Sequence, residues 1–166
     1  MQTYEWERGD ASCLEECKNE AAGKANIVME TEIEGGDFSH AGQGASDLKG
    51  RMKKLGIPHE TVKRTAVSAY EAEMNVVIHT LRGTMRSTIT SNRVKVTVKD
   101  EGQGISDIEK ALKPGYSTAT EEVREMGFGA GLGFTNIRRN ADRLLIKTKD
   151  GEGTEIEIIV CLDHRP

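Results

Sequence analysis

Two polar side chains interrupt an otherwise apolar segment, Ala69–Thr80, that has the pattern of a buried helix. Glu71 and Asn75 are four residues apart, so on a helix they lie on one face, one turn from each other. A carboxylate can accept a proton from a hydroxyl group, and an amide oxygen can bind a divalent cation. By itself the pair is also consistent with a solvated edge of the helix.

Three further segments that could bind a ligand follow in the chain. They are DEGQG (Asp100–Gly104) at the end of a predicted strand, GFGAGLG (Gly127–Gly133) before a predicted helix, and GT (Gly153–Thr154) at the start of a strand. Glycines let the backbone approach a flat ring or a phosphate group, and the N-terminus of a helix attracts anions. In isolation, GFGAGLG could be a flexible linker and DEGQG a turn whose aspartate caps the next helix.

Taken together and in this order, the four motifs resemble the ATP-binding domain of the GHKL superfamily, which includes gyrase, sensor histidine kinases and mismatch-repair ATPases. The resemblance covers about residues 27–162. The stretches IVMETEIEGGDFSHAGQ, GYSTA and GFGAGLGFTNIRR are most similar to the bacterial anti-sigma-factor and switch-protein serine kinases. The resemblance therefore implies a kinase that uses ATP and Mg²⁺ to phosphorylate a serine or threonine of a regulatory partner of the antagonist (STAS) type. The expected protein partners are such an antagonist, a sigma factor, or both.

The resemblance also implies a role for each motif. Glu71 would be the general base and Asn75 would hold Mg²⁺, which prefers oxygen ligands and keeps several waters. Asp100 would accept a hydrogen bond from the amino group of adenine, and Thr154 would support this contact through water. The expected nucleotide-binding residues are Asp100, Gly102, Gly104, Gly127, Gly129, Gly131, Leu132, Gly133 and Thr154.

The elements that must position these residues can be predicted from the hydrophobic pattern. Apolar residues alternate as in strands or recur at helical spacing, and glycine and proline mark the ends. The result is an α+β fold, a two-layer sandwich with a mixed, mostly antiparallel sheet and helices on one face. The predicted elements are strands at about 26–36, 84–90, 93–100 and a final hairpin at 144–162, helices at about 44–55, 59–81, 106–112 and 134–144, and a long loop at 113–133.

The chain of 166 residues has the size of one domain. Residues 1–24 are polar and charged, and we expect a loose arm or a short helix there, followed by the ATP-binding domain at 25–166. Cys13, Cys17 and Cys161 are odd in number and scattered, which favours free thiols in a reducing compartment. A metal shared with a partner through Cys13 and Cys17 is the alternative.

Composition restricts the possible partners. The net charge is -4 and the mean hydropathy is -0.53, so the protein lacks the basic surplus that nucleic-acid binders usually show. No apolar run approaches the ~20 residues of a membrane span, and the N-terminus has no secretory signal pattern. We therefore expect a cytoplasmic protein that binds neither nucleic acid nor membrane, and that can form a homodimer as small relatives often do.

Other nucleotide and kinase motifs fit the sequence poorly. It contains neither G-x-x-x-x-G-K-[ST] nor G-x-G-x-x-G, which excludes a P-loop and a Rossmann fingerprint. HETVK (His59–Lys63) resembles the phosphoacceptor box of histidine kinases, but it lies on the same predicted helix as Glu71 rather than on a separate dimerisation domain. His79 continues the face of Asn75 and could contact phosphate or metal, or the last carbonyls of its helix.

Two other functions remain open at this level. One is a module that senses ATP or ADP and changes partners without phosphotransfer, although such a sensor would not need Glu71. The other is slow ATP hydrolysis coupled to a conformational change.

Overall fold

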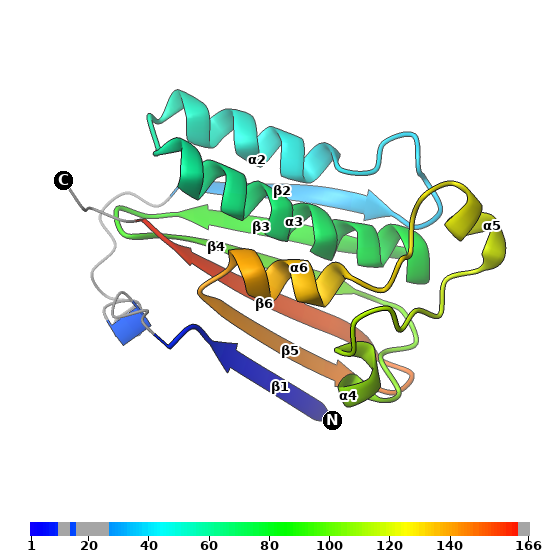
Figure 1. The fold of residues 1–166 in the computed structure, drawn as a ribbon. Helices are drawn as coiled ribbons and strands as arrows, with labels where there is room; N and C mark the ends of the chain where they lie inside the picture. The colour runs from blue at the N-terminus through cyan, green and yellow to red at the C-terminus, as the bar shows by residue number, and fades with distance from the viewer. Residues whose placement is uncertain (10–13, 16–26, 163–166) are drawn as a thin grey trace.

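A single six-stranded sheet carries three longer helices on one face (Figure 1). The computed structural model describes residues 1–9, 14–15 and 27–162. The strand order is β1-β5-β6-β4-β3-β2, and every neighbouring pair is antiparallel. The strands are β1 (Gln2–Glu7), β2 (Ile27–Glu34), β3 (Arg82–Ile89), β4 (Arg93–Asp100), β5 (Arg143–Lys149) and β6 (Gly153–Cys161). The helices are α2 (Gln43–Lys54), α3 (His59–His79), α4 (Ile108–Ala111), α5 (Glu121–Glu125) and α6 (Gly133–Asn140).

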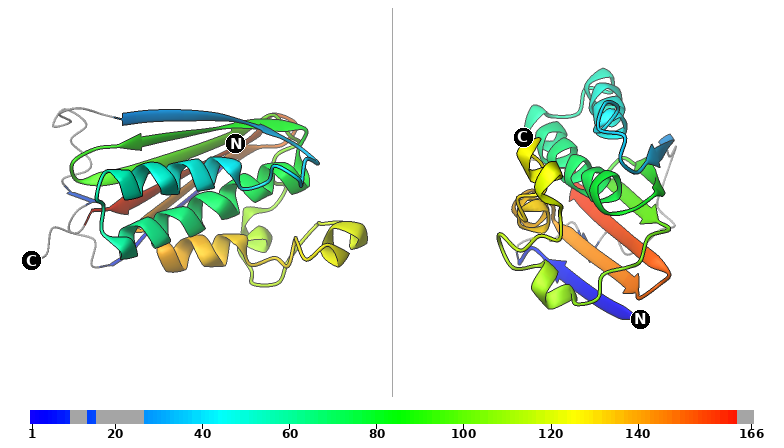
Figure 2. Two further views of the ribbon diagram at one scale, coloured as in Figure 1. Left: turned by 90° about the horizontal axis from the view of Figure 1, so that it is seen from above. Right: turned by 90° about the vertical axis from the view of Figure 1, so that its right-hand side faces the viewer.

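The core lies between the sheet and helices α2, α3 and α6, as the view along the layers shows (Figure 2). Alternate residues of the central strands point into it because successive side chains of a strand face opposite sides. Val96 of β4 and its partner Ile158 of β6 are both fully buried, for example, with Val76 of α3 in the same cluster. The predicted sandwich with helices on one face is confirmed, and the described strands form a wholly antiparallel sheet rather than a mixed one.

Three parts of the chain meet at one end of the central strands. β4 ends at Asp100, β6 begins at Gly153, and the end of β5 pairs with that beginning, with Lys149 opposite Gly153. The C-terminal end of α3 lies over the same end of the strands, and the segment with α5 extends beyond it (Figure 2, left). The motifs DEGQG and GT are therefore neighbours in space.

The N-terminal segment differs from the loose arm or short helix that we predicted, because Gln2–Glu7 form an edge strand paired with β5. Tyr4 and Trp6 alternate with glutamates and pack half-buried against the core. This alternation is a strand pattern, but it is only a few residues long. Gln2 also donates hydrogen bonds to the carbonyls of Ile105 and Ser106, so β1 contacts the segment that follows DEGQG.

The cysteines also depart from expectation, because Cys161 is disulfide-bonded. Free thiols were therefore the wrong prediction for this residue, while Cys13 and Cys17 lie outside the described residues. Cys161 and Ile159 of β6 form a small buried cluster with Leu14. This cluster lies on the face of β6 opposite to Ile158 and Val160, which belong to the main core.

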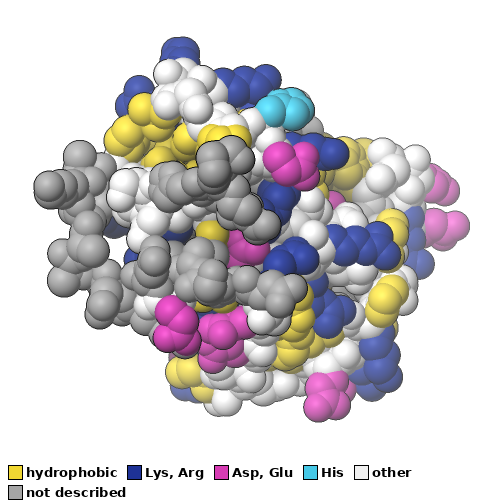
Figure 3. Space-filling model, turned by 60° about the vertical axis from the view of Figure 1, so that its left-hand side comes forward, with side chains coloured by type: hydrophobic (Ala, Val, Ile, Leu, Met, Phe, Trp, Pro, Cys, Tyr) yellow, Lys and Arg dark blue, Asp and Glu magenta, His cyan; other side chains and the backbone are white. Residues whose placement is uncertain are grey.

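The described surface carries charges of both signs. Figure 3 shows Lys and Arg side chains interspersed with Asp and Glu over one face. Within the described ranges, no helix combines the length and apolar character required to cross a membrane.

Candidate nucleotide-binding site

Glu71 and Asn75 meet the start of helix α6. A Cβ placed on Gly133, the first residue of α6, would lie 3.3 Å from Glu71 Oε2 and 3.8 Å from Asn75 Oδ1. The structure thus brings together three residues that the sequence analysis assigned to one site. Among the described residues, the buried Nδ2 of Asn75 has no hydrogen-bond partner, as expected for a side chain whose partners belong to a ligand.

A second carboxylate of α3, Glu73, holds the neighbouring helix. Glu73 is buried, and its two carboxylate oxygens accept hydrogen bonds from the backbone amides of Gly44 (3.1 Å) and Ala45 (3.0 Å). These amides belong to the first turn of α2, where Gly42 supplies no side-chain cap. Glu73 therefore replaces the missing cap and fixes α2 to the helix of Glu71. Sequence reasoning overlooked this residue, although a glutamate in the middle of an apolar helix face was a signal.

Asp100 is buried at the end of β4, where it is 8% exposed. Its Oδ1 accepts hydrogen bonds from the backbone amides of Gly102 (2.8 Å) and Thr154 (3.2 Å). Burial raises the pKa of Asp100, and these two hydrogen bonds partly offset that effect. Because both amides bond to Oδ1, Oδ2 is the oxygen that can accept a hydrogen bond from a ligand.

Glycines around Asp100 allow close approach of backbone segments. A Cβ on Gly102 would lie 2.7 Å from Thr80 Cγ2, and one on Gly153, whose φ is 97°, would lie 2.2 Å from the carbonyl oxygen of Asp100. At Gly104, with φ of 78°, the corresponding distance to the carbonyl oxygen of Lys149 is 2.3 Å. A larger residue would displace backbone atoms at Gly153 and Gly104, and the Thr80 side chain at Gly102.

The hydroxyl group of Thr148 connects these segments. It accepts a hydrogen bond from the backbone amide of Ile105 (2.8 Å) and lies 2.9 Å from the hydroxyl of Thr154. Thr148 therefore holds the loop after Asp100 against β5 and β6. Sequence reasoning did not find this residue, because a threonine within a strand carries no distinguishing pattern.

The glycine-rich segment Gly127–Gly133 folds against the earlier part of the same loop. Gly127, Gly129 and Gly131 all have positive φ, and the amide of Gly115 donates to the carbonyl of Gly131 at 2.9 Å. Leu132 precedes α6 and gives it no side-chain cap. The first amides of α6 can therefore bind an anion.

The loop between α4 and α6 contains a short helix that the sequence analysis did not predict, α5, capped by the side chain of Thr120. Phe128 packs against Phe38, which lies between β2 and α2, with ring centroids 5.1 Å apart. Thr118 contacts His79 at the end of α3, with 3.4 Å between Oγ1 and Nδ1. Burial lowers the pKa of His79. His79 thus contacts the loop, whereas the sequence analysis expected it to contact either phosphate or metal, or the last carbonyls of its helix.

The expected Mg²⁺ site is of a kind with few protein ligands. Among the described residues, no group of three or more His, Cys, Asp or Glu side chains is placed to hold a metal ion. The Asn75 amide oxygen fits instead an ion whose remaining ligands are phosphate oxygens and waters.

Comparisons with known proteins show the family to which the chain belongs. The family described as histidine kinase-like ATPase domain matches residues 40–160, well over half of the chain. The anti-sigma F factor of Caldanaerobacter subterraneus subsp. tengcongensis is 38% identical over 100 residues, which cover 57% of this chain and 65% of that protein. The anti-sigma F factor of Anoxybacillus flavithermus is 30% identical over 100 residues, covering 60% and 62%.

A relative with a kinase name is also similar. The serine/threonine-protein kinase RsbT of Bacillus subtilis is 28% identical over 114 residues, which cover 66% of this chain and 80% of that protein. The chain spans somewhat less than two thirds of the two anti-sigma F factors, at 65% and 62% of their lengths. Its match to the family extends from the loop before α2 to the end of β6 and includes every motif of the site. The chain therefore belongs to the histidine kinase-like ATPase domain family.

Proposed function

We propose that this protein is a serine/threonine kinase of the anti-sigma regulatory type, which uses Mg²⁺ and ATP to phosphorylate a STAS-type antagonist in a bacterial partner-switching pathway. The observation that carries the proposal is the convergence of Glu71 and Asn75 on Gly133, where the glycine-rich segment becomes helix α6. The printed names of the relatives, anti-sigma F factor and serine/threonine-protein kinase, support it.

Nucleotide recognition is assigned to the end of the central strands where β4 ends and β6 begins. Asp100 Oδ2 accepts a hydrogen bond from the amino group of adenine, whereas guanine presents a carbonyl oxygen at the same position and is disfavoured. Gly102 and Gly104 let the loop approach the ring, and Thr154 supports the contact. The amides at the start of α6 and the glycines before it bind the phosphates.

Phosphotransfer is assigned to the other end of the site. Bound Mg²⁺ and ATP would supply the γ-phosphoryl group and neutralise its charge. Asn75 Oδ1 holds the cation, and Glu71 accepts the proton of the acceptor hydroxyl as that oxygen bonds to phosphorus. The bond between the β- and γ-phosphates breaks, and ADP is released.

Label transfer tests this proposal. The protein is incubated with ATP labelled at the γ-phosphate and a panel of STAS-domain proteins, and labelled residues are identified by mass spectrometry. Phosphoserine or phosphothreonine on one STAS protein is the expected result. Nucleotide binding with no labelled acceptor would instead identify a sensor of ATP or ADP. The cytoplasmic location and the homodimer stay predictions.

A further inference from the structure

Glu71 has a hydrogen-bond donor on a different helix. Asn136 of α6 donates from Nδ2 to Glu71 Oε1 at 2.9 Å. The other carboxylate oxygen of Glu71, Oε2, is the one nearest to Gly133. The two oxygens therefore have different surroundings, one fixed by a protein donor and one directed at the start of α6.

Helix α6 links this donor to the phosphate-binding segment. Gly133 and Asn136 are three residues apart on the helix, so they lie on the same face, toward α3. An anion bound at the first turn of α6 is thus held by the same short helix that holds Glu71. The contact between Asn136 and Glu71 therefore ties the position of the carboxylate on α3 to the first turn of α6.

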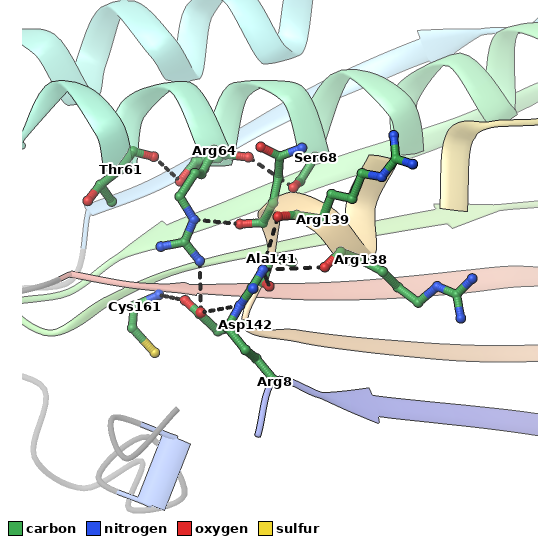
Figure 4. A network of polar contacts seen from close by, with 11 residues as sticks. Arg8, Thr61, Arg64, Ser68, Arg138, Arg139, Ala141, Asp142 and Cys161 are labelled. Atoms are coloured by element: carbon green, nitrogen blue, oxygen red, sulfur yellow. Dashed lines mark hydrogen bonds and ion pairs between the residues drawn. The ribbon is translucent and has the colours of Figure 1, made fainter. Parts of the chain in front are cut away.

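The C-terminal end of α6 is fixed by two arginines (Figure 4). The guanidinium group of Arg8, just after β1, donates to the carbonyls of Arg139 (3.0 Å) and Ala141 (2.9 Å). Arg64 of α3 donates to the carbonyl of Asn140 at 2.8 Å and forms an ion pair with the buried Asp142. These bonds satisfy the last carbonyls of the helix, so α6 is anchored at the end away from the phosphates.

We propose that Asn136 is a positioning residue for the general base. It holds Glu71 Oε1 by a hydrogen bond so that Oε2 faces the acceptor hydroxyl. This inference rests on the proposed kinase function. Fixing the orientation of a catalytic group through a second residue commonly affects the rate more than it affects binding.

The informative variant is Asn136→Asp, which keeps the shape of the side chain but places a carboxylate against Glu71. A matched control is Asn140→Asp, on the same helix one turn further, where the side chain donates to the Asn136 carbonyl rather than to Glu71. For both variants, transfer of the labelled γ-phosphoryl group from ATP is measured in two assays. With the protein alone the acceptor is water, and with the STAS protein added the acceptor is that protein. ADP affinity is followed by thermal shift.

We expect Asn136→Asp to lower kcat at least roughly tenfold, with the KM for ATP and the ADP affinity within about twofold of the native values. Asn140→Asp should stay within about twofold in all three quantities. In a Glu71→Gln background, Asn136→Asp should have no further effect on kcat, because the residue it positions no longer acts as a base. A purely structural contact between α3 and α6 would instead lower stability equally in both backgrounds without this kcat pattern.

The outcomes separate the inference from the function on which it rests. Native kcat in Asn136→Asp, with Glu71→Gln inactive, overturns the positioning role and leaves the kinase proposal intact. A native rate in Glu71→Gln, or no transfer by the native protein with or without an acceptor, overturns both.

Discussion

The two ends of the candidate site are built differently. At the proposed adenine end, Asp100 is buried at the end of a strand, and backbone amides donate hydrogen bonds to one of its carboxylate oxygens. The Thr148 hydroxyl holds the loop that follows by accepting a hydrogen bond from its backbone. At the phosphate end, the loop before α6 is held by the contact of Phe128 with Phe38 and by the Thr118–His79 pair. The proposed adenine site thus rests on the sheet, and the proposed transfer site rests on a loop and two helices.

The exposed side chains reflect the same division. Three large apolar residues of the loop are partly exposed, Tyr116 at 44%, Met126 at 49% and Leu132 at 43%. Asp100 and Thr154, by contrast, are buried. Substitutions at the adenine end should therefore change nucleotide affinity, those at Glu71 and Asn75 should chiefly change the transfer rate, and those that loosen the loop should change the KM for ATP.

Among substitutions at residues other than Glu71, the largest expected effect comes from Asn75→Ala at the phosphate end. Without the amide oxygen, Mg²⁺ loses its protein ligand, and we predict a fall in transfer rate of roughly 10²- to 10³-fold. ADP affinity in EDTA should equal that of the native protein, while the increase caused by added Mg²⁺ should disappear. Asn75→Asp, which retains an oxygen ligand, is the control, and titration calorimetry with and without Mg²⁺ makes the comparison. The same Mg²⁺ increment in Asn75→Ala as in the native protein would exclude Asn75 as the ligand.

Asp100→Asn should affect binding rather than transfer. The amide can still accept the hydrogen bonds from Gly102 and Thr154, but its NH₂ group opposes the amino group of adenine. We expect ADP to bind roughly 100-fold more weakly. At ~100 times the dissociation constant, ADP should add about 2.7 kcal/mol to the stability of the native protein, and most of this gain should be absent in the variant. An undiminished thermal shift would contradict the assignment of Asp100.

Asp100→Asn should also change how the stability of the nucleotide-free protein depends on pH. Burial raises the pKa of Asp100 above its ordinary 3.8, so its contribution to stability is fully present below that value and is lost as the pH rises through the raised pKa. Asp100→Asn cannot ionise, and its melting temperature relative to the native protein should therefore increase from pH 4 upward. Thermal unfolding between pH 4 and pH 8 measures this trend, and a constant difference would refute it.

Phe128→Ala tests how firmly the loop is held. An aromatic pair contributes about 0.5–1.5 kcal/mol beyond its buried area, so losing the contact with Phe38 should raise the KM for ATP by roughly 3- to 10-fold. Met126→Ala, an exposed residue of the same loop, should change KM less than about twofold. If the two variants behave alike, the Phe38–Phe128 contact has no role in holding the loop.

The smallest effect is expected from His79→Asn. Burial lowers the pKa of His79 from 6.5, so its contribution to stability is fully present above pH 6.5 and is lost as the pH falls through the lowered pKa. Asparagine offers Thr118 an acceptor and does not titrate. The variant should therefore lose less stability than the native protein between pH 6.5 and pH 5, as followed by thermal unfolding, and parallel losses would contradict this.

The sequence predicted the sheet well where apolar residues alternate over a whole strand, as in β4 with Val94, Val96 and Val98. It was less informative for short elements. α5 has only five residues, too few to show a helical period, and is marked chiefly by its Thr120 cap. α3 ends two residues earlier than predicted because Thr80 is extended.

The residues of the site were predicted only in part, and for a different reason. The motif residues could be predicted because their order along the chain resembles a known family. Thr148 and Asn136 could not, because each acts through a contact between segments distant in sequence, such as the bond from Asn136 to Glu71 across 65 positions. For Glu73 the sequence signalled a carboxylate on an apolar helix face, but not its partners on α2. The residues that support a site leave little local pattern, since their partners are chosen by the fold.

We propose that Glu71 acts in transfer and not in binding, and the Glu71→Gln variant tests this proposal. Transfer of label from ATP to the acceptor protein and ADP affinity are measured on the same preparation. We expect a loss of transfer of roughly 10²- to 10⁴-fold, with ADP affinity within about threefold of the native value. Transfer at the native rate by Glu71→Gln would contradict it.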